Sequence, residues 1–264
     1  MKYLFINSVA GFGSTGRIIL STCEQLERQG HTCRIAYGRQ AVDCDIPTMT
    51  IGNAWDYRLH ALTHRIFGTG GFGSRAATAR FLRQVREYDP DVIWLHNLHG
   101  YYIHIGLLFD YLRGSGKKII WTLHDCWAFT GNCPYFSAVG CEKWKTCCGS
   151  CPQKNVYPKA LLDASRKNHL HKKSLFTGIA DLSLEVPSQW LAELVRESFL
   201  RDYPIRVVPN RVDTEVFHPT ESDFRQRMGL ENSFLVLGVA NVWEPRKGLA
   251  DFLRLSTLLP DCCR

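Results

Sequence analysis

The sequence predicts an α/β fold in which helices cover both faces of a doubly wound, Rossmann-like parallel sheet. Short apolar, β-rich segments alternate with amphipathic helical segments along most of the chain, and this alternation is typical of parallel sheets. Residues 3–37 form the first strand–loop–helix–strand repeat, which is one right-handed β-α-β crossover. The pattern restarts at Phe234, where the first strand and helix of a second Rossmann-like domain are predicted.

Composition and charge narrow the class of protein. The chain has 264 residues, of which 45% are hydrophobic and 22% charged, as in ordinary globular domains. The net charge of +7 is spread along the chain, which favours an anionic small substrate or a membrane surface over nucleic acid. No segment reads as a signal peptide or as an apolar span of about 18 residues. These features predict a cytoplasmic protein, at most peripheral at the inner face of the cell membrane.

The predicted elements before the central strand follow the chain in order. Ser14 or Thr15 is expected to cap the first helix, and residues 40–54 read as irregular. Strands are predicted at 3–7, 32–37, 92–95 and 118–123, and helices at 17–28, 55–67, 75–87 and 103–113.

The later elements complete one domain and begin another. A long helix over 158–175 is expected to begin at Pro158, and Ser188 is expected to cap a helix between strands at 180–187 and 205–209. A new strand at 234–241 and a helix at 249–259 follow. The predicted boundaries are a first domain at 1–210 with a cysteine-rich loop at 126–152, a linker at 211–229, and an incomplete second domain at 230–264.

Polar residues follow two of the buried strands. His124 and Asp125 come directly after the strand at 118–123, and His96 and His99 follow the strand at 92–95. Ligands of open α/β sheets bind outside the carboxyl ends of the strands, so His124 and Asp125 are candidates for chemistry. The alternative is a capping aspartate with a solvated histidine, and local hydrogen bonding is an equal alternative for His96 and His99.

A glycine-rich loop joins the first strand to the first helix. Gly11, Gly13 and Gly16 match the G-x-G-x-x-G pattern, in which a helix N-terminus faces a phosphate. No acidic residue follows the second strand, where Arg39 stands instead, which argues against NAD but permits the 2′-phosphate of NADP. A sugar-nucleotide or phosphate site, an NADP-dependent oxidoreductase and a purely structural turn all remain open. Arg246 and Lys247 follow the restarted strand, where a cation can reach a diphosphate.

The loop after His124 is rich in cysteine. Cys133, Cys141, Cys148 and Cys151 provide four thiols, two of them as C-x-x-C, which suits a structural zinc with tetrahedral coordination. The alternative is a loop of reduced, partly buried thiols. The β-α context of a thioredoxin motif is missing, so redox catalysis is not expected.

The motifs together resemble a known family. They are the glycine loop, T-L-H-D-x-W-x-F-T-G-x-C, C-x-x-C-P, V-P-S-x-W-L, V-V-P-N-x-V-D-T-x-V-F-x-P and E-x-R-K-G. The combination resembles glycosyltransferase family 4, whose members are retaining enzymes of the GT-B fold that use nucleotide-sugar donors. The cysteine-loop variety is similar to glycosyltransferases of exopolysaccharide biosynthesis, such as that of colanic acid.

The resemblance implies roles for particular residues. Gly11 and Gly13 would lie near the donor diphosphate, and Arg246 and Lys247 would bind its phosphates. His124, with Asp125, would be the catalytic histidine of the cleft. His96 and His99 are candidates for the acceptor side. The implied partners are a UDP- or GDP-sugar and a glycan or lipid-linked acceptor, transfer needs no cofactor, and any zinc would be structural.

The chain departs from the family pattern at three places. Arg211 stands where the family usually has glycine, Asn241 stands where it often has arginine, and the later donor-domain residues are absent before the final Leu259-Pro260-Asp261-Cys262-Cys263-Arg264. We therefore expect a truncated donor domain and an inactive chain. The alternatives to a transferase are the NADP-dependent oxidoreductase and a zinc-stabilised, non-catalytic binding module.

Overall fold

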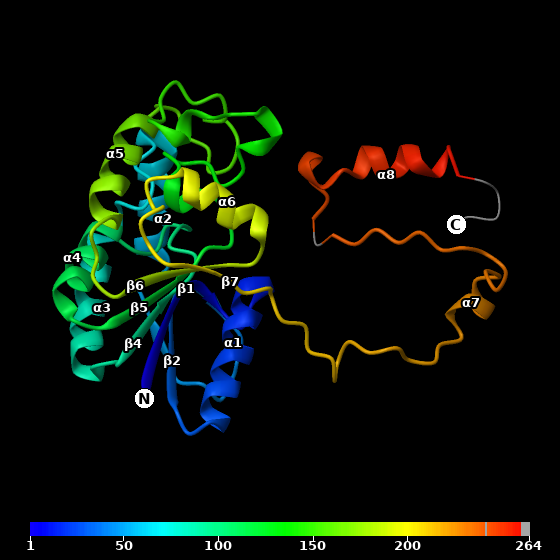
Figure 1. The fold of residues 1–264 in the computed structure, drawn as a ribbon, viewed down its shortest axis with the longest axis horizontal. Helices are drawn as coiled ribbons and strands as arrows, with labels where there is room; N and C mark the ends of the chain where they lie inside the picture. Colours follow the sequence, from blue (N-terminus) through cyan, green and yellow to red (C-terminus); the bar gives the residue numbers. More distant parts are fainter. Residues whose placement is uncertain (241, 260–264) are drawn as a thin grey trace. The chain divides into compact units, whose positions relative to one another are not determined.

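A computed structural model describes residues 1–240 and 242–259 of the chain. The chain divides into two compact units, Met1–Arg211 and Val212–Arg264, and each is described here by itself (Figure 1). In the described residues, no helix is long and apolar enough to cross a membrane.

The first unit contains the predicted doubly wound sheet. Its seven strands are all parallel and lie in the order β3-β2-β1-β4-β5-β6-β7. The strand order reverses between β1 and β4, which is the point where ligands bind in such sheets. The strands are β1 Lys2–Ala10, β2 Thr32–Ala41, β3 Thr48–Thr50, β4 Val92–Leu95, β5 Lys118–Thr122, β6 Leu182–Val186 and β7 Ile205–Val207.

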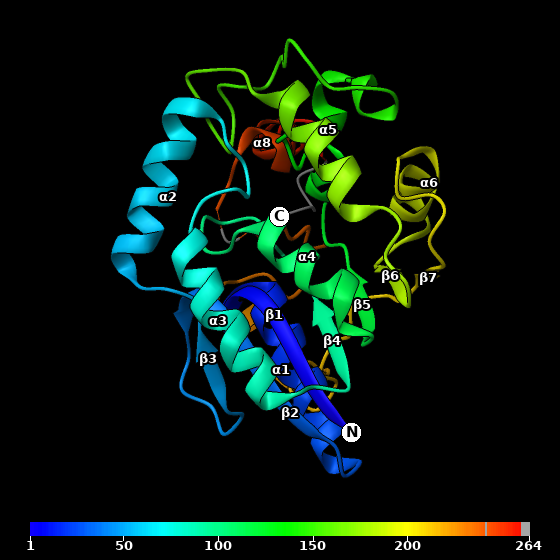
Figure 2. The ribbon, with the colours of Figure 1, turned by 90° about the vertical axis from the view of Figure 1, so that its left-hand side faces the viewer.

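Helices cover both faces of this sheet. The helix α1 lies on one face and α3 and α4 lie on the other (Figure 2). The helices are α1 Gly13–Arg28, α2 Ala54–Phe67, α3 Arg75–Tyr88, α4 Ile105–Ser115, α5 Ser165–Phe176 and α6 Gln189–Glu197.

The two cores follow from alternation along the strands, because successive side chains of a strand point to opposite faces. Phe5 of β1 packs with Ile19 and Cys23 of α1, whereas Leu4 and Ile6 pack with the side chains of α3 and α4 on the other face. All five side chains are buried. The sheet is therefore held from both sides, and its carboxyl edge is rigidly placed.

The structure corrects the predicted extent of one helix and adds one strand in this unit. The helix predicted from Pro158 begins only at Ser165, because the backbone N–H groups of Leu161 and Leu162 instead donate to the carbonyl oxygens of Arg65 and Ile66 at the end of α2. Those carbonyls have no partner inside their own helix. The strand β3 was missed within 40–54 because three residues give too short a pattern to recognise.

The second unit contains the helices α7 Phe224–Arg227 and α8 Leu249–Ser256 and one helical turn at Pro245–Lys247. No residue of its described part, 212–240 and 242–259, is buried. The strand predicted at 234–241 is not formed over 234–240, and Asn241 lies outside the described residues. A strand needs a paired neighbour to satisfy its backbone hydrogen bonds, and in the described part of the chain Phe234 forms only an isolated β-bridge and residues 235–240 pair with no strand.

Candidate active site at the carboxyl edge of the sheet

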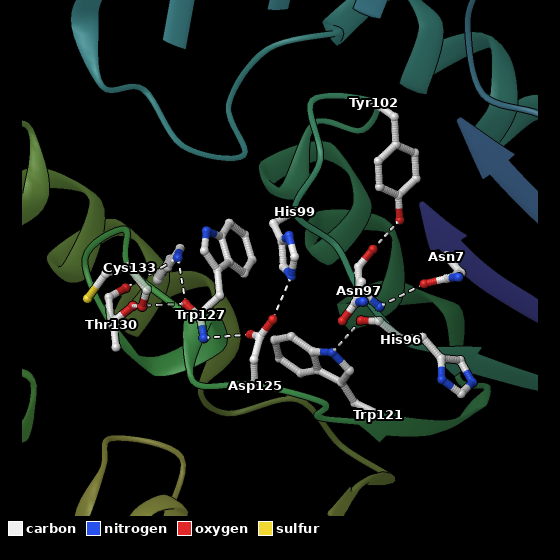
Figure 3. Close-up of polar contacts among 11 residues, drawn as sticks. Asn7, His96, Asn97, His99, Tyr102, Trp121, Asp125, Trp127, Thr130 and Cys133 are labelled. Carbon is white, nitrogen blue, oxygen red and sulfur yellow. Dashed lines mark hydrogen bonds and ion pairs between the residues drawn. The ribbon is translucent and has the colours of Figure 1, made fainter. Parts of the chain in front are cut away.

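The ends of β1 and β4 are joined by a buried asparagine. The Oδ1 atom of Asn7 accepts a hydrogen bond from the backbone N–H of Asn97 at 3.2 Å, and its Nδ2 donates to the carbonyl oxygen of Val9 at 2.8 Å. The hydroxyl of Tyr102 donates to the carbonyl oxygen of Asn97 at 2.8 Å. These bonds fix the loop that carries His96 and His99 (Figure 3). Sequence reasoning missed Asn7, although a polar residue inside a buried strand was a visible signal.

His99 and Asp125 form a hydrogen bond across the ends of β4 and β5. The Nε2 atom of His99 lies 2.8 Å from Oδ2 of Asp125, and the side chains are 17% and 10% exposed. The other carboxylate oxygen accepts from the backbone N–H of Trp127 at 2.9 Å (Figure 3). Burial opposes ionisation of Asp125, but the charge and hydrogen bond of His99 and the N–H of Trp127 together lower its pKa. Asp125 is therefore an ionised carboxylate that orients the imidazole of His99.

His124 lies against a second histidine. Its Nε2 atom is 2.9 Å from Nδ1 of His96, and the two rings stack with their centroids 5.2 Å apart and an interplanar angle of 16°. Burial lowers the pKa of His124 to about 4, although Asp125 acts in the opposite direction. Burial also holds the pKa of His96 well below its ordinary value. Both imidazoles are therefore neutral at neutral pH, and His96 is a buried partner of His124 with no open face.

A cavity of about 120 Å³ opens beside His124 and Asp125. Its other walls come from the loop after β5, through Tyr135, and from the start of α6, through Ser188 and Trp190. The side-chain oxygen of Ser188 accepts from the backbone N–H of Leu191 at 3.3 Å, which confirms the predicted helix cap. The predicted site residues of β5 therefore line an accessible space at the edge where the fold places ligands.

The glycine loop makes a tight turn before α1. Gly11 has a φ of +64°, and a Cβ there would lie 2.2 Å from Cγ2 of Val42, so only glycine fits. The helix begins at Gly13, with Phe12 as its N-cap and no side-chain cap, so the expected cap by Ser14 or Thr15 was wrong. The first-turn N–H groups of α1 consequently face outward without a side-chain acceptor.

The four cysteines come near one another but form no metal site. Cys133, Cys141, Cys148 and Cys151 all line one small cavity of about 20 Å³. In the described part of the chain, however, no cluster of three or more histidine, cysteine, aspartate or glutamate side chains is arranged to hold a metal ion. The Sγ atom of Cys148 instead accepts from the backbone N–H of Gly131 at 3.2 Å. The structure does not support the predicted zinc, and the thiols are free.

The thiols of this loop differ in acidity. A hydrogen bond from the Cys133 thiol stabilises the thiolate of Cys151 and lowers its pKa to about 7. The same interaction, together with burial, strongly raises the pKa of Cys133. Burial raises the pKa of Cys148 to about 11. The thiol of Cys151 is thus considerably more acidic than those of Cys133 and Cys148.

A buried lysine attaches the cysteine loop to the domain. The Nζ atom of Lys172 in α5 donates to the carbonyl oxygens of Trp127 at 2.7 Å and Thr130 at 3.2 Å, and it lies 3.2 Å from the centroid of the Trp127 ring. Burial pushes the pKa of Lys172 well below its ordinary value. Lys172 was missed because a lysine in an amphipathic helix normally predicts an exposed face.

The two cations predicted for the donor lie in the second unit. Arg246 and Lys247 belong to the turn Pro245–Lys247, and the Nε atom of Arg246 lies 2.7 Å from Oε2 of Glu244. Gly11, Gly13, His96, His99, His124 and Asp125 all lie in the first unit.

Comparison with solved structures defines the class of fold. The structure of a sucrose-phosphate synthase from Thermosynechococcus elongatus aligns with a TM-score of 0.62 and 12% identity. The alignment covers 98% of this chain and 60% of the synthase. WaaG, a glycosyltransferase involved in lipopolysaccharide biosynthesis, matches over the same shares with a TM-score of 0.54 and 13% identity. The architecture is therefore that of GT-B glycosyltransferases, as the resemblance implied.

The family follows from the sequence match. Residues 15–216 match Glycosyltransferase Family 4, and the chain belongs to this family. A putative colanic acid biosynthesis glycosyl transferase, WcaC of Escherichia coli K12, is 30% identical over 156 residues, which are 56% of this chain and 37% of the relative. The chain thus spans well under half the length of this curated relative.

Proposed function

We propose that Met1–Arg211 forms the acceptor half of a retaining glycosyltransferase of exopolysaccharide biosynthesis. The enzyme would move a sugar from UDP or GDP to a glycan or lipid-linked acceptor. The single observation that supports this most is that His124 and Asp125 line a cavity at the carboxyl edge of the sheet, where Asp125 also binds the imidazole of His99. Family membership and the name of the Escherichia coli relative point to the same chemistry.

In this proposal the first unit supplies the groups that act on the sugar. His124 reaches the transferred sugar or the leaving oxygen, and ionised Asp125 adds negative charge where positive charge develops on the sugar ring. His99, oriented by Asp125, contacts an acceptor hydroxyl. His96 acts behind His124 rather than on the acceptor, because it is 4% exposed.

The donor phosphates would meet backbone N–H groups and cations. The open first turn of α1 after Gly11 and Gly13 suits an anion, and Arg246 and Lys247 would neutralise the departing nucleoside diphosphate. Neither contribution requires a metal for transfer. In this proposal residues 1–210 form the acceptor-side domain, residues 211–229 are a linker, and residues 230–264 begin the donor domain.

The oxidoreductase alternative has less support. Arg39, the residue that could accept a 2′-phosphate, lies with its guanidinium 5.1 Å from the centroid of the Tyr57 ring. Titration of the 264-residue chain with UDP, GDP and NADPH separates the readings. Binding of NADPH alone would favour the oxidoreductase. If the chain binds neither a nucleoside diphosphate nor NADPH, the transfer assay described next tests the acceptor half.

The transfer test uses a chimera of residues 1–211 with the complete second domain of the Escherichia coli relative. We expect multiple turnovers with a radiolabelled UDP- or GDP-sugar and a lipid-linked acceptor. His124→Ala should raise the activation free energy by about 3–4 kcal/mol, the cost of one lost preorganised donor. His31→Ala is the matched control, since His31 lies at the opposite edge of the sheet, before β2. Equal losses in both variants would remove His124 from the mechanism.

A second part of the proposal concerns the membrane. Three exposed side chains follow one face of α2 at helical spacing, namely Trp55, Leu59 and Leu62, and they are 75%, 66% and 57% exposed. Leu161 and Leu162, also exposed, are tied to the end of α2 by their backbone hydrogen bonds. We call these five residues the α2 ridge. An apolar helix face of this kind suits the boundary between lipid headgroups and acyl chains.

The charge of residues 46–86, the segment that contains α2, favours an anionic lipid surface over a second copy of this chain. Residues 46–86 contain six arginines and one acidic residue, Asp56. The carboxylate of Asp56 accepts from the backbone N–H of Asn53 and pairs with Arg80 at 3.4 Å. Arg58 lies 5.4 Å from the centroid of the Trp55 ring. Two such positive surfaces would repel each other, whereas anionic headgroups attract them.

Vesicle flotation tests this part. The chain should float with vesicles of phosphatidylglycerol and phosphatidylcholine, and less with phosphatidylcholine alone. The double variant Trp55→Ser/Leu59→Ser should lose most of the binding, while Trp190→Ser, which removes an exposed tryptophan from α6, should keep it. Equal binding by both variants, or concentration-dependent dimerisation that Trp55→Ser/Leu59→Ser abolishes, would contradict the lipid assignment.

A further inference from the structure

His96 occupies an unusual position behind the candidate catalytic histidine. It follows β4 directly, and its backbone N–H donates to the carbonyl oxygen of Ile6 at 2.9 Å. Its ring stacks between aromatic neighbours, with centroids 6.2 Å from Trp94 and 6.0 Å from Phe5. Only 4% of the residue is exposed. Its Nδ1 atom contacts His124, and its Nε2 atom is buried without a hydrogen-bond partner among the described residues.

The contact between the two histidines requires one shared proton. Nδ1 of His96 and Nε2 of His124 are 2.9 Å apart, so one nitrogen must donate and the other must accept. Two arrangements of a neutral pair are possible. Either His96 donates from Nδ1 and its Nε2 carries a bare lone pair, or His124 donates from Nε2 and His96 carries a buried Nε2–H with no acceptor.

The surroundings of His96 decide between these arrangements. Buried N–H groups without an acceptor are the rarer kind of unsatisfied group in folded proteins, and lone pairs without a donor are better tolerated. The Nδ1 atom of His124 has no such constraint, because His124 lines the cavity beside α6 and its Nδ1 is not one of the buried polar atoms without a partner. The arrangement in which His96 donates therefore leaves no buried N–H group unpaired in either ring.

We propose that His96 is a positioning residue that fixes His124 in the Nδ1–H form, so that His124 enters the cavity as a hydrogen-bond donor. A ring in this form offers its proton to an oxygen with negative or partly negative charge, such as a sugar hydroxyl or a phosphate oxygen. It offers no lone pair to the cavity and does not serve there as a general base. The identity of the ligand in this inference rests on the proposed function. The position of the proton on His124 does not depend on that function.

The ligand-free 264-residue chain provides the first test. Long-range ¹H–¹⁵N correlation spectra of protein labelled with ¹⁵N-histidine distinguish the protonated from the unprotonated nitrogen of each ring. At pH 7 we expect His124 to be protonated at Nδ1 and unprotonated at Nε2, and we expect no signal from a His124 ring protonated at Nε2. A protonated Nε2 on His124 would overturn the inference even if the protein were an active transferase, and the expected pattern would stand even if no transfer were found.

Two variants at position 96 separate positioning from packing. An asparagine amide can place an N–H group where Nδ1 of histidine lies, so His96→Asn should keep the His124 signals of the original chain. His96→Leu removes the donor while filling similar volume, and the His124 nitrogens should then shift toward a mixture of both forms. Tryptophan near-ultraviolet circular dichroism checks that each variant is folded. An unchanged His124 spectrum in folded His96→Leu would contradict the positioning role of His96. If His96→Leu fails to fold, the ligand-free spectrum of the unsubstituted chain still shows which His124 nitrogen carries the proton.

Discussion

Similar sequence patterns have different structures in the two units of this chain. Val92–Leu95 and residues 234–240 are both short apolar runs, yet the first is a strand paired on both sides and the second forms no strand. In the first unit Phe109 and Phe176 are completely buried, whereas Leu237 in the second is 84% exposed. An apolar run becomes a strand only when neighbouring strands satisfy its backbone and helices cover its faces.

The largest expected difference between the units comes from removing one phenylalanine from each. Phe109→Ala empties a buried site next to Trp121 and Phe176 and should lower the free energy of unfolding by about 3–5 kcal/mol. Phe217→Ala, at a 68% exposed position of the second unit, should change it by less than about 0.5 kcal/mol. Urea unfolding of both variants measures this. A large loss from Phe217→Ala would mean that the second unit contains a core of its own.

Asp125→Asn should have the next largest effect. It removes a charged partner of His99 and weakens the acceptor of the Trp127 N–H, which should cost about 1.5–3 kcal/mol at pH 7. Because folding lowers the pKa of Asp125, its contribution is present above the ordinary pKa of aspartate, about 4, and is lost as the pH falls through the folded value. The free energies of unfolding of the two proteins should therefore converge on acidification.

Measurements of unfolding between pH 3 and pH 7 check this convergence. Asp223→Asn in the second unit is the control, since the exposed Asp223 forms an ion pair with Arg227 at 3.6 Å, and it should leave the pH profile unchanged. A difference between the original chain and Asp125→Asn that stays constant from pH 7 to pH 3 would mean that the carboxylate is not stabilised by the fold.

A smaller effect is expected from helix and turn caps. Ser188→Ala removes the side-chain acceptor at the start of α6 and should lower the free energy of unfolding by about 1 kcal/mol. Asp213 in the second unit accepts the backbone N–H groups of Glu215 and Val216 in the same manner. Asp213→Ala should nevertheless leave the main transition in place, because that turn is exposed. Equal shifts of the thermal midpoint would show that both units unfold together.

The smallest expected effect is a difference in the rates at which two thiols of the first unit react with a labelling reagent. Cys151 should react with iodoacetamide faster than Cys23 at pH 7.5, because its pKa is lowered to about 7 whereas burial and Cys33 strongly raise that of Cys23. Mass spectrometry of peptides at successive times gives both rates. Cys133→Ser should slow labelling of Cys151 relative to the original chain. Faster reaction of Cys23 would contradict the assignment of the acidic thiol.

Much of the first unit could be predicted because its signals are local. Apolar runs bounded by glycine and charge place β1, β2, β4, β5 and β6, and Ser188 marks the start of α6 by a capping pattern that needs no tertiary information. The loop from Gly11 follows from the same kind of reasoning. The edge that carries His124 and Asp125 was predictable because the carboxyl ends of parallel strands must meet there.

What could not be predicted depends on contacts between distant segments. The late start of α5 at Ser165 results from backbone bonds to α2, almost a hundred residues earlier. The sequence left His96 open between acceptor contact and local hydrogen bonding, and the stack with Phe5 and Trp94 that buries it depends on tertiary packing. The zinc prediction relied on spacing alone, and spacing does not determine whether thiols point toward a common centre.

The common direction of all seven strands has an evolutionary consequence. Because every strand ends at the same edge, each connecting loop there can lengthen or change composition without altering the register of the sheet beneath it. The cysteine-rich segment between β5 and α5 is such an elaboration, and Lys172 holds it by hydrogen bonds to two backbone oxygens and by its contact with the Trp127 ring. Because the hydrogen bonds of this anchor go to main-chain oxygens, side chains of the segment other than Trp127 can be exchanged while the segment stays attached to the sheet.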